Sequence, residues 1–196
     1  MKVSRQLSRF IVPLLAAAFA SSAPAAAATL SVDPPHTSAS FSVKHLALTT
    51  VSGSILPTSV TIVLAQGDAP ASVEATFDLS TIDTREPDRD ADLKSDHWFE
   101  IAKFPTMTFK STHISTPDAG GAFTIEGDLA FHGVSKPVSL AAKIDGEIKD
   151  SKGRTHVGYS ATATVDRRDW NLGLSYPPLV VGDDVTINIQ LEAIKT

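Results

Sequence analysis

The feature that most constrains the fold of this chain is the alternation of apolar and polar residues along many short segments. From Ala39 to His45 the odd positions read Ala, Phe, Val and His, whereas the even positions read Ser, Ser and Lys. Side chains on a β-strand point alternately to the two faces of a sheet, so this pattern indicates a strand with one buried face. The alternation recurs with apolar faces formed by Val73, Ala75, Phe77 and Leu79; by Phe123, Ile125, Leu129 and Phe131; by Val138, Leu140, Ala142 and Ile144; by Val157, Tyr159, Ala161, Ala163 and Val165; and by Val185, Ile187, Ile189 and Leu191. The chain is therefore predicted to be all-β.

Short turn signals separate these segments. They are Gly67-Asp68, the stretch 118–121, the Gly133 to Pro137 corner, the stretch 150–153 and Gly182-Asp183. Such spacing predicts about eight strands in mostly antiparallel order, arranged as a closed barrel or as a sandwich. Closure is favoured because it removes the unpaired strand edges that promote aggregation.

One stretch, Arg85 to Phe99, interrupts the alternation. Helix-forming residues follow Pro87, and proline is tolerated in a first helical turn. We predict one or two short helices near Pro87 to Ile101, lying across one end of the barrel. Leu93, Trp98 and Phe99 can turn inward while the acidic residues face water, which fits a lid over an apolar cavity. The alternative is that these aromatic side chains simply plug the barrel end.

The first 28 residues are typical of a secretory signal peptide. Lys2, Arg5 and Arg9 precede an apolar run from Phe10 to Ala20, and small residues follow it as far as Ala28. We expect cleavage before Thr29, a periplasmic location and a single domain over residues 29–196; the alternative is an uncleaved membrane anchor. Removal of this segment takes away three basic residues and no acidic ones, which changes the formal charge from −5 to −8. A basic surface for nucleic acid is therefore not expected, and the absence of cysteine excludes disulfide and thiol chemistry.

Reactive groups show no pattern that points to catalysis or metal binding. The acidic run from Asp88 resembles half of a calcium loop, but its sixth position is Leu93 instead of glycine and its twelfth is Phe99 instead of glutamate. His97 has no histidine three or four residues away, as a helical zinc site would require, and the chain contains no G-x-S-x-G sequence. Paired carboxylates for glycoside hydrolysis remain open from the sequence. We expect no metal ion, no catalytic residues and no enzymatic activity.

The predicted inward faces combine small and large residues. The small ones are Ala39, Ala75, Gly127, Ala142, Ala161 and Ala163, and the large ones are Phe41, Phe77, Phe109 and Phe131. The interior of a barrel of about eight strands is either filled by its own side chains or holds one small ligand. Small residues on several neighbouring strands favour a space for a ligand.

Four segments closely resemble the YceI-like polyisoprenoid-binding proteins. They are DPPHTSASFSVKHL from Asp33, DTREPDRDADLKSDHWFEIAKFPTMTFKS from Asp83, GDLAFHGVSKPVSL from Gly127 and DRRDWNLGL from Asp166. The resemblance implies a periplasmic, lipocalin-like antiparallel β-barrel that holds a long isoprenoid or similar lipid, often as a dimer, without a cofactor. The chain departs from the family pattern at Thr37, where serine is common, and at Trp98 and Trp170, where phenylalanine is more usual.

The alternation and the resemblance together give a set of candidate ligand-binding residues. They are Phe41, Val43, His45, Phe77, Leu93, Trp98, Phe99, Phe109, Phe131, Arg168 and Trp170. His45 and Arg168 can contact a ligand or support the fold, whereas Arg89 is expected to pair with Asp90 for structure.

The predicted function is therefore non-catalytic binding, transport or storage of a hydrophobic chain. The expected partners are this ligand, a membrane or membrane lipid donor in transient contact, and a second copy of the chain. Two alternatives remain: an enzyme that acts on such a lipid, with His45 or His97 as acid or base, and a ligand-free structural protein of the stress response.

Overall fold

The structure of the protein is a computed structural model that describes residues 28–65 and 69–195. Its strands are β1 (Thr29–Val32), β2 (Ser38–His45), β3 (Thr49–Ser54), β4 (Pro57–Leu64), β5 (Pro70–Asp78), β6 (Thr106–Ile114), β7 (Ala122–Phe131), β8 (Val134–Lys149), β9 (Thr155–Asp166) and β10 (Val181–Lys195). Its helices are the α-helix α1 (Pro87–Lys94) and the short 3₁₀ helices η1 (Pro34–His36), η2 (Leu79–Thr81) and η3 (Arg167–Trp170). Residues 1–27 of the predicted signal peptide lie outside the described residues.

The strands form a closed antiparallel barrel. The ring runs β1, β4, β5, β6, β7, β8, β9 and β10, and β10 pairs again with β1. β2 extends the line of β1 along the same edge of β10, and β3 pairs with β2 in antiparallel register. The predicted barrel of about eight strands is therefore confirmed, and the sandwich alternative is excluded.

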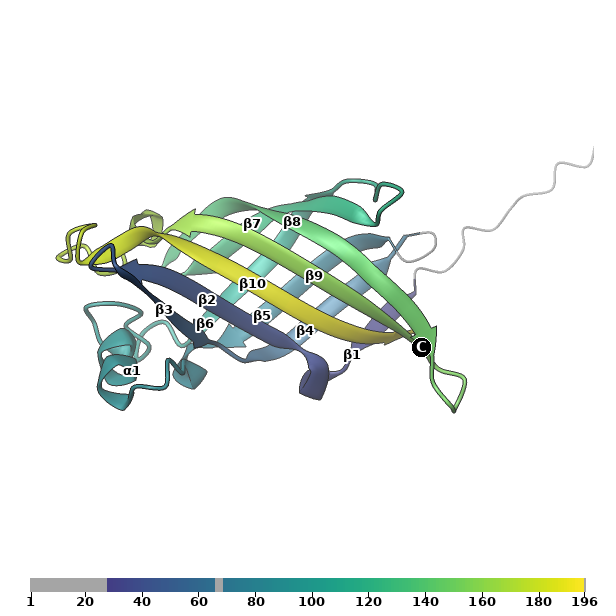
Figure 1. Ribbon diagram of the computed structural model, residues 1–196, viewed down its shortest axis with the longest axis horizontal. Coiled ribbons are helices and arrows are strands. Elements are labelled where there is room, and N and C mark those ends of the chain that lie inside the picture. Colours follow the sequence, from purple (N-terminus) through teal and green to yellow (C-terminus); the bar gives the residue numbers. More distant parts are fainter. Residues whose placement is uncertain (1–27, 66–68, 196) are drawn as a thin grey trace, which may run out of the picture.

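The barrel is elongated and its two ends differ (Figure 1). One end, here called the lid end, carries α1, the β2–β3 turn and the loop 171–180. The opposite end, here called the C-terminal end, is where β10 finishes beside β1. Val157 and Ala193 are fully buried near this second end, so its interior is packed by the protein's own side chains.

Hydrogen bonds and a capped helix fix the lid segment, residues 85–104. The Glu86 side chain accepts a 2.6 Å hydrogen bond from the Arg89 backbone N–H, which caps the first turn of α1. The Asp90 carboxylate accepts hydrogen bonds from the backbone N–H and the hydroxyl of buried Thr84, at 2.9 and 2.5 Å. The prediction of a short helix in this segment is confirmed, and α1 is the one α-helix among the described residues.

Two of the small residues that were expected to leave space in the interior, Gly127 and Ala163, do not. Ala163 is buried at 6% exposure and does not border the interior cavity described below. Gly127 does point inward, but it leaves no space, because the Phe109 ring lies across it and a Cβ at Gly127 would sit 2.5 Å from Phe109 Cζ. Glycine is therefore required here so that an aromatic ring can pack against the backbone of the next strand.

None of the helices in the described part of the chain has the length and apolar character needed to cross a membrane.

Candidate ligand-binding cavity

The inward faces of the strands enclose a cavity of about 400 Å³. Its walls extend along β10 from Val181 at the lid end to Leu191 near the C-terminal end, which corresponds to roughly 30 Å of extended strand. The volume lies within the range of roughly 300–1,000 Å³ that is usual for small-molecule sites. The expectation of an interior space is met, although the C-terminal end is filled.

Alanine residues in register account for much of the free space. Ala142 on β8 pairs with Ala161 on β9, Ala161 pairs with Ile189 on β10, and Ile189 pairs with Ala39 on β2. All four residues line the cavity, so one level of the barrel has three methyl groups where larger side chains would meet in a filled core. Ala161 and Ile189 are only half-buried, as expected for residues that border a space.

The structure places most of the predicted site residues on this wall. The residues that line the cavity are Phe41, Val43, His45, Phe77, Leu93, Trp98, Phe99, Phe109, Phe131 and Trp170. His45 lies at the end of β2 and is exposed, so it is a residue of the cavity mouth instead of the interior. Arg168 is absent from the cavity wall.

Arg168 lies outside the barrel because it occupies an even position just past the end of β9, whereas the inward positions of β9 are odd. Its guanidinium is half-exposed and contacts the Asp166 carboxylate at 2.8 Å and the Asp183 carboxylate at 3.1 Å. The hydrogen bonds from Arg168 lower the pKa of the Asp166 carboxyl below its ordinary value. The interpretation of Arg168 as a ligand contact is therefore replaced by a role in holding η3 and the start of β10 together.

Its neighbour Arg167 was missed by the sequence reasoning and borders the cavity instead. Arg167 is only 2% exposed and donates to the carbonyl oxygens of Leu172, Gly173, Tyr176, Val181 and Gly182 at 2.7 to 3.1 Å. It also lies 2.9 Å from an Asp183 carboxylate oxygen that is otherwise buried without a hydrogen bond. A buried arginine needs such partners, and here it fixes the loop 171–180 at the mouth. The signal was present in the sequence, since Arg167 continues the odd, inward positions of β9.

Trp98 joins the lid segment to the loop 171–180. Its indole N–H donates to the Asp92 carboxylate at 3.0 Å, and its ring stacks on Tyr176 with a centroid separation of 5.1 Å. The Trp98 ring also lies directly against Gly173. The φ of Gly173 is +55°, a backbone conformation that favours glycine. The Arg167 guanidinium lies 5.7 Å from the centre of the same ring.

A second cluster of aromatic rings packs beneath the lid segment. The rings of Phe131 and Trp170 stack at 5.1 Å, and Phe99 packs against Phe131 at 5.8 Å. The Trp170 N–H donates to the Leu129 carbonyl oxygen at 3.1 Å, so this tryptophan is held in one orientation and is 1% exposed. The lid aromatics therefore do pack the barrel end, but a cavity remains beneath them.

The chemistry of the cavity is apolar apart from groups near its mouth. Arg89 borders the cavity, but its Nε and Nη2 already donate to the Thr84 hydroxyl and carbonyl oxygens at 2.7 and 2.9 Å. The expected pairing of Arg89 with Asp90 is therefore wrong, because Thr84 lies between them and binds both side chains. Asp92 is engaged by Trp98, and Arg167 by backbone carbonyls. This arrangement can exclude water and hold a hydrocarbon, with Lys44 and His45 placed at the mouth.

Comparisons with known proteins agree with this architecture. The sequence profile of the YceI-like domain matches residues 30–193. A UPF0312 protein from Pectobacterium atrosepticum is 30% identical over 190 residues, which cover 96% of each chain. The crystal structure of the Campylobacter jejuni YceI protein aligns with a TM-score of 0.69 at 27% identity, over 78% of this chain and 90% of that one. A polyisoprenoid binding domain from Saccharophagus degradans aligns with a TM-score of 0.60 at 14% identity, over 87% of this chain and 99% of that one.

Proposed function

Because this chain belongs to the YceI-like domain family, we propose that it binds one long, flexible hydrophobic chain, such as an isoprenoid, a quinone tail or a fatty-acid derivative, and carries or stores it in the periplasm without chemical change. The observation that carries this proposal is the apolar cavity of about 400 Å³ that runs along the barrel. The polyisoprenoid binding named for a protein of the same fold supports the class of ligand.

The energetics of burial favour such a ligand. Transfer of each CH₂ group from water contributes about 0.8 kcal/mol, so one five-carbon isoprene unit contributes roughly 3–4 kcal/mol before ordering costs. A micromolar complex requires about 8 kcal/mol, so two units are too few, whereas four or more, at roughly 12–16 kcal/mol in total, leave a margin for the ordering costs without a polar contact. We expect length and girth to select the ligand more strongly than the chemistry of its head group.

The head group would lie at the mouth, where the polar groups of the cavity are found. Lys44 and His45 line this part of the wall and are exposed. Arg89 and Arg167 near the mouth already donate hydrogen bonds within the protein, so they support the cavity wall and do not bind the ligand. This placement favours a carrier, because the side chains at the level of Ala142, Ala161 and Ile189 offer a hydrocarbon only apolar contacts.

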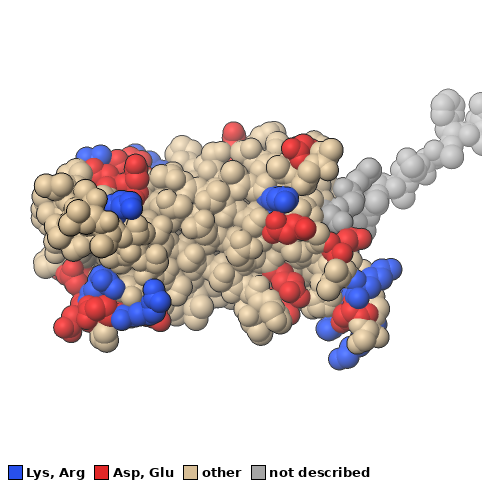
Figure 2. All heavy atoms as spheres, in the orientation of Figure 1, with Lys and Arg blue, Asp and Glu red and all other residues tan. Residues whose placement is uncertain are grey.

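Exposed leucines surround the same mouth. Leu46 and Leu48 in the β2–β3 turn are 46% and 79% exposed, and Leu174 and Leu179 in the loop 171–180 are 62% and 69% exposed. The two loops adjoin, since the Leu46 backbone N–H donates to the Val180 carbonyl at 3.0 Å. At this end of the barrel, on the left of Figure 2, an uncharged surface projects beyond the charged side chains. We call these four residues the leucine rim.

The leucine rim would contact a lipid bilayer during loading and release. It is continuous with the cavity mouth, because His45 precedes Leu46 and Val180 follows Leu179 on the cavity wall. Large apolar side chains exposed together mark sites of protein or membrane contact. A hydrocarbon could then pass from the bilayer into the barrel with little exposure to water.

The protein is also expected to form a homodimer, which light scattering after size exclusion would measure.

Native mass spectrometry of protein purified from its own host tests the main proposal. We expect one apolar ligand per chain, released on denaturation with an unchanged mass after long incubation with the protein. A ligand converted to a new product would favour the enzyme alternative. Bare protein that also fails to bind C15 to C40 isoprenoids would contradict the proposal.

Vesicle transfer tests the leucine rim separately. The protein would be mixed with phosphatidylglycerol vesicles that contain a fluorescent isoprenoid, and the rate of transfer would be measured. Replacement of Leu48 and Leu179 by serine should slow the transfer at least tenfold while equilibrium binding from detergent stays unchanged. Ile148 is 70% exposed on β8, outside the lid end, so Ile148→Ser is the matched control. Equal transfer rates for all variants would exclude membrane contact through the rim.

A further inference from the structure

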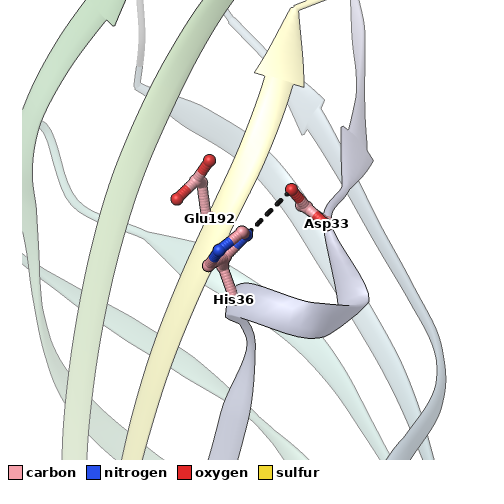
Figure 3. A group of neighbouring side chains, drawn as sticks. All are labelled: Asp33, His36 and Glu192. Carbon is pink, nitrogen blue, oxygen red and sulfur yellow. Dashed lines mark hydrogen bonds and ion pairs between the residues drawn. The ribbon is translucent and has the colours of Figure 1, made fainter.

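A cluster of metal-type ligands lies on the outer face of the barrel at the C-terminal end. Asp33 precedes η1, His36 ends η1, and Glu192 points outward from β10 (Figure 3). One ligand atom from each of these three side chains lies within 4.8 Å of the others. The His36 Nδ1 and the Asp33 carboxylate are 3.1 Å apart.

The backbone holds the three residues in fixed relation. The Asp33 backbone N–H donates to the Glu192 carbonyl oxygen at 2.8 Å, which joins the β1–η1 connection to β10. The Asp33 carbonyl oxygen in turn accepts from the His36 backbone N–H at 3.2 Å and from the Thr37 hydroxyl at 2.9 Å. The donor atoms therefore come from segments that the barrel has already placed side by side.

A second histidine orients Glu192 from the other side. His156 on β9 is largely buried, and its Nδ1 lies 2.7 Å from Glu192 Oε1. Its Nε2 lies 3.3 Å from the Asp150 carboxylate, which is paired with Arg154 at 2.7 Å. This chain of contacts uses one oxygen of Glu192 and leaves the second oxygen for another partner. Metal-binding carboxylates are commonly supported by such outer hydrogen bonds.

We propose that Asp33, His36 and Glu192 bind a divalent transition metal ion, Zn²⁺ in the first instance, with His156 as a positioning residue. Two carboxylates balance the charge of the ion, and an imidazole nitrogen favours zinc over calcium or magnesium, which prefer oxygen ligands. Tetrahedral zinc with bonds of about 2.0–2.2 Å requires ligand atoms roughly 3.3–3.6 Å apart. The exposed His36 side chain can rotate to make this adjustment, and solvent supplies the fourth ligand.

The ion would act as a clamp on the barrel. β1 completes the ring through three residue pairs with β10 and two with β4. A metal ion held by η1 and β10 would fasten that short junction from outside. The spacing of the histidines in the sequence does not predict this site, because His36 and Glu192 come together only when the barrel closes.

Zinc titration of the chelator-treated full-length protein tests the site. We expect isothermal calorimetry to give one Zn²⁺ per chain with a micromolar or lower Kd, and thermal unfolding to shift upward with zinc but not with Mg²⁺ or Ca²⁺. His36→Ala should weaken zinc binding at least 100-fold while the melting temperature without metal stays unchanged, because His36 is 65% exposed at its side chain. His156→Ala should weaken binding about 10- to 100-fold.

His97→Ala is the matched control. His97 has the same side-chain exposure of 65% and also lies beside carboxylates, at the lid end. Retention of one zinc ion in this variant and its loss in His36→Ala would support the site. Equal zinc binding in both variants, a stoichiometry well below one, or no measurable heat with the unmodified protein would overturn it.

Discussion

Replacement of Ala161 by phenylalanine should close the cavity without damage to the barrel. Ala161 stands between Ala142 and Ile189 in the row of small residues that borders the space. A phenyl ring at this position would occupy the volume of about one five-carbon unit of ligand. At about 0.8 kcal/mol per displaced CH₂ the loss is roughly 4 kcal/mol, or nearly 1,000-fold in affinity.

The effect on stability distinguishes a real space from a packed core. A ring that enters a space should leave the free energy of unfolding unchanged or raise it, whereas overpacking costs about 1–3 kcal/mol. Ala163, two residues further along β9, is 6% exposed and does not border the cavity, so Ala163→Phe is the matched control. It should lower the free energy of unfolding by that amount.

Two measurements together check this prediction. Urea unfolding gives the stability of both variants, and displacement of a fluorescent apolar dye by a C20 isoprenoid alcohol gives their affinity. If Ala161→Phe were as destabilising as Ala163→Phe, or if it bound the alcohol as tightly as the unmodified protein, the ligand would not lie at this level of the barrel.

Three further predictions concern the mouth and its supports. Arg167→Lys should lower the free energy of unfolding by about 3–5 kcal/mol, because lysine cannot satisfy the surrounding carbonyls. Arg168→Lys should lower it by less than about 1 kcal/mol. Urea unfolding measures both. Trp98→Ala should lower the free energy of unfolding by about 3–5 kcal/mol and speed amide exchange across the lid segment. Trp98→Phe should lower it by only about 1 kcal/mol, because it loses the hydrogen bond to Asp92 but keeps a ring. Equal exchange in both variants would contradict the role of the ring. The lowered pKa of Asp166 means that its carboxylate stabilises the fold above the ordinary aspartate pKa and that this stabilisation is lost as the pH falls through the folded-state pKa. The difference in unfolding free energy between the protein and Asp166→Asn should thus be constant near pH 7 and shrink below about pH 4; a difference that grows with acid would refute this assignment.

Strand alternation predicted the all-β class and most of the cavity lining, whereas the preference for a barrel over a sandwich came from the need to close strand edges and from the family resemblance. Phe41, Phe77 and Phe131 lie inside because period-two patterns fix the face of every residue once one face is buried. The same rule placed His45 on the inward side, but it could not show that β2 ends there and exposes the ring at the mouth.

Residues beyond the strand ends were harder to predict. Arg167 and Arg168 are neighbours with the same chemistry. The alternation of β9 puts Arg167 on the inward side, but only the path of η3 and of the loop 171–180 brings it the carbonyl oxygens that it binds. The packing of Phe109 over Gly127 also depends on register between two strands, which no single-strand pattern contains. Contacts of this kind depend on tertiary geometry, so local periodicity gives no information about them.

The short pairing of β1 with β10 also bears on how the chain reaches its native state. Residues 30–32 find their partners at 193–195, so the wall is completed by the contact with the largest separation along the sequence. Contacts of long range carry a large loop-closure entropy and slow the search for the native topology. Until β10 has taken its place, the hairpins can form one after another, but the sheet stays open and its apolar face stays wet. The final kinetic step is therefore expected to be the docking of the first described strand on the last.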